Sequence, residues 1–416
     1  MALPRTVYDR TRHAAARTSE FLFNQLIPYI GNKRRLLKLI QQAVEQTAVQ
    51  PGARFVDFFA GSGVVARWAK LLGYRVIAND WEPYAQAIHR CYIACNRPPA
   101  MAALGGYERA IERLNRLPPV AGWVTEHLCP GDDVHFDIKR DRMFYMRKNG
   151  MRIDAIREQI AAWKQGEAIT ELEEACLLAP LIYQACYTSN TSGVFKGFHN
   201  GWGGQTSTAL YRIAGDLRLS MPVFCDNGAE NLVFREDAQA LAARLAHEPV
   251  DIAYLDPPYN QHPYGSNYHV LNSVALWDKP ALSKQITRGT KAAIRLDWRT
   301  ERRSAYNYRD EAAGAYDRLL GTIRAHYILT SYSTDGMIPL ESLLESNVCR
   351  GHIAVVMQGY KRYRVSSQRF SKKPMNVEFV LVLDTRRRAN LSAAELRRII
   401  RQREAEVLDA HPETGG

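Results

Sequence analysis

The feature that most constrains this 416-residue chain is a strand, a turn, a helix and a second strand within residues 54–80. Arg54–Phe58 is an apolar strand candidate, and Ala60–Gly63 (Ala-Gly-Ser-Gly) follows it as a tight turn. Val64–Leu72 predicts a helix and Tyr74–Ala78 a second strand. Two strands joined by a helical crossover lie parallel, so this unit predicts an α/β fold with a parallel sheet.

Later apolar segments predict that the same α/β domain is completed near the end of the chain. Val250–Leu255 has the length and composition of a buried strand. Further strands are expected at His326–Ser331, Ile353–Met357 and Val377–Leu383. Near the start, Arg34–Gln46 predicts a helix that places Leu36, Leu37, Ile40, Ala43 and Val44 on one face.

Residues 97–230 lack this alternation of strands and helices. They contain Pro98-Pro99, Pro118-Pro119 and a glycine-rich stretch, Asn190–Gly204. Prolines and glycines interrupt regular elements. We therefore expect residues 97–230 to form a separate, mostly helical and irregular domain, inserted into the α/β domain.

The excess of basic residues bears on the kind of partner. The chain has 55 Lys and Arg against 43 Asp and Glu, a net charge of +12. This charge favours a polyanion such as nucleic acid, although many basic proteins bind none. The apolar stretches are too short to cross a bilayer, and the N-terminal segment lacks the apolar core of a signal peptide. The seven cysteines show no metal-ligand spacing, so we expect reduced thiols, no metal site and a cytoplasmic protein.

The glycine-containing turn predicts a cofactor site. Asp57–Gly63 stands at the carboxyl end of the first strand, where open α/β sheets bind ligands, and glycine lets the backbone approach a cofactor closely. Asp80 ends the second strand, near the spacing expected of a ribose-binding acid. A dinucleotide would also suit this spacing, but the GxGxxG pattern is absent, and Asp57 suits a cationic amino-acid cofactor better than a pyrophosphate. A structural turn without a ligand is the alternative.

Asp256-Pro257-Pro258-Tyr259 directly follows the strand Val250–Leu255 and is the most specific motif. A carboxylate and a backbone carbonyl can each accept a hydrogen bond from the amino group of adenine and draw its nitrogen toward tetrahedral geometry. We expect Asp256 and the Pro257 carbonyl to do this, so that the nitrogen lone pair can attack a methyl donor. The prolines stiffen the loop, and Tyr259 offers a ring to a base swung out of the duplex. The structural alternative is a proline-rich turn with Asp256 as a cap and Tyr259 in the core.

These motifs together resemble the Dam-like class of adenine-specific DNA methyltransferases, and more specifically its restriction-modification members. The resemblance covers most of residues 23–383. Six segments carry it: Pro28–Lys33, Asp57–Gly63, Asn79-Asp80, Tyr187–Phe195, Asp256–Tyr259 and Ile328–Ser333. The long loop Asn260–His269 after the tetrapeptide also resembles the restriction-modification members.

The resemblance implies a Rossmann-like S-adenosylmethionine-dependent methyltransferase sheet with an inserted, mostly helical target-recognition domain. It implies transfer of a methyl group from S-adenosylmethionine to the amino nitrogen of adenine in double-stranded DNA, by base flipping and without a metal. A cognate restriction endonuclease is the implied functional partner. The expected division is a flexible basic arm (1–20), the cofactor half of the catalytic domain (21–96), the recognition domain (97–230), the catalytic half (231–385) and a basic C-terminal helix and tail (386–416).

The resemblance also implies which residues form the site. The catalytic residues are expected to be Asp256, Pro257, Pro258 and Tyr259. The cofactor-binding residues are expected to be Tyr29, Lys33, Asp57, Phe58, Ala60, Gly61, Gly63, Asp80 and Asp237. Of these, Tyr29 and Lys33 occupy the places of an aromatic and a lysine that form the cofactor pocket and the DNA side of the site.

One segment departs from the family pattern. The family usually has an acid followed by an aromatic where this chain has Asp237-Ala238. Stacking on the flipped base would then fall to Tyr259 or to Tyr264. His262 and His269 are candidate bases, with solvent or Asp256 as the alternative acceptors of the amino proton.

Two basic segments interleaved with aromatic residues are expected to contact DNA phosphates. They are Lys139–Lys148, which includes Phe144 and Tyr145, and Tyr360–Lys373. A solvated charged face is the alternative for each segment. The expected DNA-binding residues are Lys139, Arg140, Arg142, Lys361, Arg362 and, from the family resemblance in the recognition domain, Asn190. The arginine-rich helix Leu396–Arg403 is expected to lie on the surface and not to read bases.

Other functions remain open at the level of sequence. Cytosine amino methyltransferases usually carry Ser, and guanine-directed RNA enzymes Asn, where this chain has Asp256, although some cytosine enzymes keep Asp. A DNA-binding regulator that had lost catalysis would have no physical reason to retain Asp256 beside two prolines. A nicotinamide dehydrogenase is disfavoured, because no acid–base pair is evident where a hydride acceptor would sit.

Overall fold

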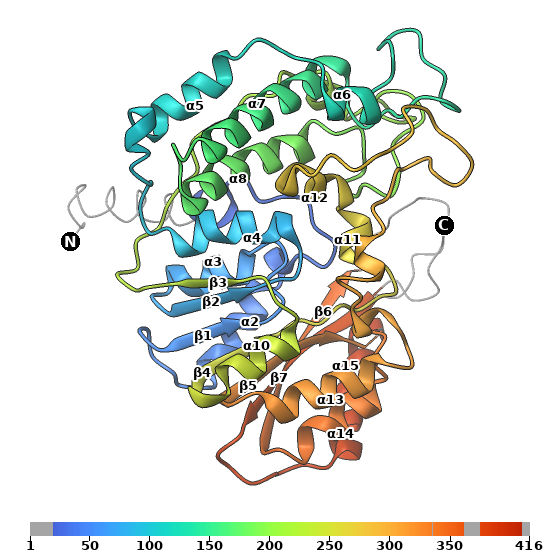
Figure 1. Ribbon diagram of the computed structural model, residues 1–416. Coiled ribbons are helices and arrows are strands. Elements are labelled where there is room, and N and C mark those ends of the chain that lie inside the picture. Colours follow the sequence, from blue (N-terminus) through green and yellow to red (C-terminus); the bar gives the residue numbers. More distant parts are fainter. Residues whose placement is uncertain (1–19, 335, 362–374, 410–416) are drawn as a thin grey trace, which may run out of the picture.

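One mixed sheet of seven strands runs through the computed structural model, which describes residues 20–334, 336–361 and 375–409 (Figure 1). The strands are β1 (Arg54–Asp57), β2 (Arg75–Asn79), β3 (Leu232–Phe234), β4 (Val250–Leu255), β5 (Ala325–Ser333), β6 (His352–Lys361) and β7 (Met375–Asp384). Their order in the sheet is β3-β2-β1-β4-β5-β7-β6. The pairs among β1 to β5 are parallel, and β7 runs antiparallel to both β5 and β6.

The six strands expected from the sequence are confirmed, with limits that shift by a few residues. β4 has the expected limits, whereas β6 extends to Lys361 beyond the expected end at Met357. β3 was not expected. It has only three residues and none of them is fully buried, so its apolar pattern is too short to indicate a strand.

Helices cover both faces of the sheet. α2 (Leu37–Glu45) and α3 (Val64–Leu71) pack on one face. The opposite face is covered by α10 (Ala238–Arg244), α13 (Ala312–Thr322), α14 (Leu340–Val348) and α15 (Ala393–Asp409). Phe55 and Val56, neighbours in β1, belong to the two opposite cores, as the alternation of side chains along a strand requires.

The helix expected at Arg34–Gln46 is confirmed, preceded by the 3-10 helix η1 (Lys33–Arg35). Its expected apolar face is buried apart from Leu37, which is partly exposed. At the other end of the chain, Ser392 and Glu395 form the capping box that opens α15. α15 also buries Leu396 and Ile400 in the core beside the sheet.

Within the block between β2 and β3, the α-helices that follow residue 97 form a helical layer beside the sheet (Figure 1). Its helices are α5 (Tyr107–Arg116), α6 (Trp123–Leu128), α7 (Arg147–Gln165), α8 (Glu171–Tyr187) and α9 (Leu210–Ile213). α8 packs against α4 (Pro83–His89) and α12 (His269–Leu276), and residues of all three helices share one apolar core. α11 (Tyr264–Asn267) precedes α12. The core of the helical layer therefore includes residues outside 97–230, and the expected domain limits remain a prediction.

The described residues contain no helix that is long and apolar enough to span a membrane. All seven cysteines are free thiols, in agreement with the sequence-based expectation. The arm expected at residues 1–20, apart from its last residue, and the tail after residue 409 lie outside the described residues.

The order of the strands determines where a ligand can bind. The strand that follows β1 in sequence, β2, lies on one side of it, and β4 lies on the other. The carboxyl ends of β1 and β4 therefore flank the point where the strand order reverses, which is where open α/β sheets bind ligands. Asp57 is the last residue of β1, and Asp256 directly follows β4.

Candidate active site

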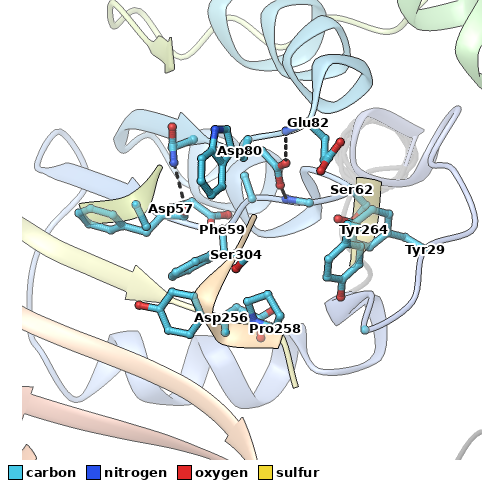
Figure 2. Close-up of a pocket in the computed structure, with 18 of the residues that line it drawn as sticks. Tyr29, Asp57, Phe59, Ser62, Asp80, Glu82, Asp256, Pro258, Tyr264 and Ser304 are labelled. Carbon is cyan, nitrogen blue, oxygen red and sulfur yellow. Dashed lines mark hydrogen bonds between the residues drawn. The ribbon is translucent and has the colours of Figure 1, made fainter. Parts of the chain in front are cut away.

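A cavity opens at these carboxyl ends, at the kind of position in an α/β sheet where small molecules and cofactors commonly bind (Figure 2). Of the residues expected from the sequence, the cavity is lined by Tyr29, Lys33, Asp57, Phe58, Ala60, Gly61, Asp80, Asp237, Asp256 and Pro258. The fold thus brings the two main motifs, which are far apart in the sequence, to one cavity. Gly63, Pro257 and Tyr259 are absent from its lining.

The turn after β1 needs its glycines for two different reasons. Gly61 has φ +53°, and a Cβ atom there would lie 2.8 Å from Cε1 of the Tyr29 ring. Gly63 has φ +81° and caps the start of α3, where a Cβ atom would lie 3.0 Å from the ring of His89. Gly61 therefore permits the close packing of the turn on Tyr29, while Gly63 allows the chain to enter α3.

Asp57 is the least satisfied group of the cavity wall. Its side chain is 1% exposed, and neither carboxylate oxygen has a hydrogen-bond partner among the residues that the structure describes. Burial, and to a lesser degree the Asp256 carboxylate, raises the pKa of Asp57 well above its usual range. An unpaired carboxylate in a cavity wall is suited to a ligand that carries a positive charge or hydrogen-bond donors.

Asp80 fixes the same turn from β2 (Figure 2). Its carboxylate accepts hydrogen bonds from the backbone N–H groups of Gly61, at 2.8 Å, and Glu82, at 2.9 Å. Burial raises the pKa of Asp80 to about 6, and the backbone donors oppose that rise. The acid expected on the ribose side of the site therefore lies in the cavity wall and also holds the glycine turn.

The tetrapeptide after β4 holds a buried ion pair. The Lys33 ammonium lies 2.9 Å from Asp256 Oδ1, and the Tyr259 hydroxyl donates a hydrogen bond of 2.7 Å to the same oxygen. Lys33 also donates to the Tyr259 hydroxyl and lies over its ring. Burial raises the pKa of Asp256, and Lys33 opposes the rise. The second oxygen, Oδ2, accepts no hydrogen bond from the described residues and remains available to a substrate.

Several aromatic rings surround the cavity. Tyr29 stacks on Tyr264 with a centroid distance of 5.0 Å and an interplanar angle of 8°, and both rings line the cavity. Tyr306 packs edge-on against Phe59 at 5.3 Å. These two also line the cavity, together with Asp237. Tyr306 and Phe59 therefore place aromatic rings in the part of the cavity where the sequence lacks an aromatic after Asp237.

Sequence reasoning missed several lining residues. Glu82, Glu236, Arg302, Ser304, Tyr306 and Asn307 all line the cavity. Four of them come from residues 302–307, which lie between α12 and α13 and end in the 3-10 helix η6 (Ala305–Asn307). This segment has no recognisable motif, and only the tertiary structure shows that it closes one side of the site.

The two histidines considered as catalytic bases do not line the cavity. His269 is 2% exposed, and its Nε2 atom lies 2.8 Å from the carbonyl oxygen of Phe195. Burial lowers the pKa of His269 to about 4. His262 lies nearer the surface, 3.1 Å from the Lys196 ammonium. Within the described part of the chain, neither histidine contacts the carboxylate of Asp256.

Two of the expected DNA-binding residues are buried, which corrects that expectation. Arg142 is 1% exposed, and its guanidinium donates to the carbonyls of His127, Ser283 and Thr290. Asn190 is fully buried and bonds to the backbone of Met143, His199, Gly201 and Gly203. Both hold loops together, because a buried polar side chain must satisfy its hydrogen bonds within the protein.

The other expected DNA-binding residues have different outcomes. Lys139 and Arg140 are exposed, whereas the aromatic residues Phe144 and Tyr145 of the same segment are fully buried. The backbone of Lys361 ends β6, but its side chain and all of Arg362 lie outside the described part of the chain.

Comparison with known proteins agrees with this geometry. A family model described as D12 class N6 adenine-specific DNA methyltransferase matches residues 29–294. The type II methyltransferase M.NlaIII of Neisseria lactamica is 30% identical over 86% of this chain and 98% of its own length. The modification methylase LlaI of Lactococcus lactis subsp. lactis is 26% identical over 85% of this chain and 54% of its own. The type II methyltransferase M.FokI of Planomicrobium okeanokoites is 29% identical over 81% of this chain and 49% of its own.

The family match covers both motifs of the cavity, the glycine turn after β1 and the tetrapeptide after β4. It also covers the helical layer between them. The first of these relatives aligns along nearly its whole length. The chain belongs to the D12 class of N6 adenine-specific DNA methyltransferases.

Proposed function

We propose that this chain methylates adenine within a short site of double-stranded DNA, with S-adenosylmethionine in the cavity as the methyl donor. The observation that carries the proposal is the placement of two carboxylates in one cavity. Among the described residues, Asp57 is buried without a hydrogen-bond partner, and Asp256 has one oxygen engaged and the other available. The Asp57 carboxylate suits a cationic cofactor, and the available oxygen of Asp256 suits the amino group of a base.

The residues of the cavity fit this cofactor. When bound, S-adenosylmethionine supplies an electrophilic methyl group on its sulfonium. Asp57 would hold the cationic part of the cofactor, and Asp80 would accept hydrogen bonds from its ribose hydroxyls. Gly61 leaves the cavity open beside Tyr29, where any larger residue would collide with the ring. The rings of Phe59 and Tyr306 offer faces and edges to the adenine of the cofactor.

The tetrapeptide acts on the base that is methylated. Asp256 Oδ2 would accept a hydrogen bond from the adenine amino group, and the Pro257 carbonyl a second one. Lys33 and Tyr259 hold the other carboxylate oxygen, so they fix the orientation of Asp256. The Tyr29–Tyr264 stack lies at the cavity wall, where an aromatic face can receive a base that has left the duplex. This arrangement positions the amino nitrogen and raises its nucleophilicity.

We further propose that the modification protects DNA from a cognate restriction endonuclease. Support comes from the similarity to two type II methyltransferases and a modification methylase. The chain spans about half the length of LlaI and M.FokI, so this proposal draws mainly on M.NlaIII, which it matches along 98% of that protein's length.

Replacement of the catalytic carboxylate tests the proposed mechanism. Asp256→Ala should abolish methyl transfer to adenine, because the amino nitrogen loses the acceptor that reshapes it. Binding of S-adenosylmethionine and of DNA, each measured by titration, should change little. As a matched control, Asp251→Ala removes a carboxylate from the opposite end of the same strand and should leave the rate of transfer near that of the wild type. Near-normal turnover by the Asp256→Ala protein would overturn the mechanism.

A further inference from the structure

Glu378 is a buried carboxyl group that the proposed reaction has not so far used. It lies in β7, opposite Ser333 of β5 and Gln358 of β6, and is 8% exposed. Its Oε2 atom has no hydrogen-bond partner among the described residues, and neither has the hydroxyl oxygen of Ser333. Burying a carboxyl group without a partner costs stability, so its presence needs an explanation.

Glu378 points to the sheet face that also carries Lys33. Side chains alternate along a strand, so Glu378 lies on the same face as Val380 and Val382, which pack in the core formed with α2. Lys33 belongs to η1, just before α2, and is 3% exposed. Burial raises the pKa of Glu378 to about 7, while the Lys33 ammonium opposes the rise and the Asp256 carboxylate adds to it.

Among the residues that the structure describes, the surroundings of Glu378 contain few other charges. Tyr254 and Tyr259 lie near enough for Glu378 to contribute to the rise of their pKa values, which burial dominates. From α15, Glu404 contacts Thr334, next to Ser333, and is itself paired with Arg401. Within the part of the chain that the structure describes, Lys33 is therefore the cation whose charge lowers the pKa of Glu378. It does so without a direct ion pair, whereas its ammonium contacts Asp256 at 2.9 Å.

The action of Lys33 on both carboxylates, Asp256 and Glu378, has a consequence for catalysis. Transfer of the methyl group would form the nitrogen–carbon bond, break the sulfur–carbon bond of the bound cofactor and leave a positive charge on the amino nitrogen. The nitrogen would then release a proton to solvent or to Asp256. Pairing with Lys33 cancels much of the charge that Asp256 presents to this nitrogen. A second carboxylate beside the same ammonium gives the three groups a net negative charge, which stabilises the developing positive charge.

We propose that Glu378 is a positioning residue for methyl transfer, which acts as the second counter-ion of Lys33 and restores negative charge beside the amino nitrogen. The proposal rests on the function proposed above. In this role Glu378 acts through its charge on Lys33 and Asp256, and it does not contact the base.

The pH dependence of the transfer step tests this role. The rate is measured under single-turnover conditions, with saturating S-adenosylmethionine and DNA, for the wild type and Glu378→Gln. Because Glu378 ionises near pH 7, the wild-type rate should rise through an inflection there. The Gln variant should lose the part of this inflection that Glu378 contributes, come within about twofold of the wild type at about pH 6 and be on the order of tenfold slower at about pH 8.5. Glu82, in the cavity wall, also has its pKa raised by burial to about 7, and it should affect both profiles equally.

Two further variants separate charge from packing. Glu378→Asp keeps the charge and should keep an inflection in the pH profile. Asp384→Asn makes the same change from carboxylate to amide at the other end of β7, and its profile should keep the wild-type inflection. A Glu378→Asp profile as flat as that of Glu378→Gln would overturn the proposal.

A second measurement needs no cofactor or DNA. The folded-state pKa of Glu378 lies above its ordinary value of 4.5, so folding favours the neutral form. Ionisation therefore lowers stability as the pH rises from 4.5 toward 7, and the loss persists above that range. The melting temperature of Glu378→Gln relative to wild type should increase between about pH 5 and about pH 8.

The outcomes distinguish the two proposals. If Glu378→Gln slows transfer by the same factor at every pH, Glu378 serves packing alone and the inference is overturned. A melting-temperature difference that does not change with pH would also overturn it. If the wild type does not methylate adenine, or does so without Asp256, the function proposed above fails first.

Discussion

At the scale of single residues, the two carboxylates of the cavity have opposite environments. Asp57 is buried and unpaired, whereas Asp256 is held by Lys33 and Tyr259. Asp57 can therefore accept hydrogen bonds on both oxygens, whereas Asp256 has one oxygen free to accept them. This difference assigns Asp57 to a ligand that brings its own charge and Asp256 to a ligand that brings an N–H donor.

This assignment predicts that Asp57 acts on the cofactor alone. Asp57→Asn should weaken S-adenosylmethionine binding by about tenfold or more, since hydrogen bonds to a charged group contribute about 1.5–3 kcal/mol. Binding of DNA should be unchanged. Calorimetric titration measures both, and Asp216→Asn, which alters a carboxylate in the helical layer, serves as the control. Unchanged cofactor affinity in Asp57→Asn would remove Asp57 from the site.

Which residues lie together was predictable from the sequence where a motif fixed them, whereas their roles in binding and catalysis stay predictions. The placement of Asp57, Gly61, Asp80 and Asp256 around one cavity agrees with the motif-based expectation. Lys33 was expected at the cofactor and DNA side, and the structure shows it buried against Asp256. A sequence cannot show which of several nearby groups a flexible lysine side chain will pair with.

At the scale of elements, the segment Lys139–Lys148 shows how composition misleads. The segment looks like one basic patch, but Arg142 faces inward and joins α6 to residues 283–290. Alternation of basic and aromatic residues suggests a nucleic-acid surface, but it does not show which side chains are exposed. The segment 302–307, which ends in the short 3-10 helix η6, presents the reverse case, because it has no motif and still lines the cavity.

Arg142 and its exposed neighbours should therefore respond differently to substitution. Arg142→Ala should lower the free energy of unfolding by about 3 kcal/mol, because it removes buried charged hydrogen bonds and leaves three carbonyls without this donor. The double variant Lys139→Ala, Arg140→Ala should leave stability near the wild-type value. If these residues bind phosphates, the double variant should also flatten the salt dependence of DNA binding, by about 0.9 in slope for each phosphate that is no longer neutralised.

Denaturant unfolding and DNA titration at several salt concentrations measure these two effects. A stable Arg142→Ala protein would contradict the structural role of Arg142. An unchanged salt slope in the double variant would place the phosphate-binding surface elsewhere on the molecule.

At the scale of the whole molecule, the sequence predicted the sheet, whereas the expected partition into domains stays a prediction. The strands carry strong local signals, and they assemble in a single sheet from both halves of the chain. The helical layer was expected as a separate insertion, yet its core includes α4 and α12 from outside 97–230. Local patterns indicate elements, but only the packed structure shows which elements share a core.

The central claim is that this chain methylates adenine at a short DNA site by means of Asp256. The most direct test is single-molecule sequencing of plasmid DNA from cells that express the wild type or the Asp256→Ala variant. The account predicts methyladenine at one short sequence motif with the wild type and none with the variant. Unmodified DNA, methylcytosine in place of methyladenine, or equal modification by both proteins would contradict it.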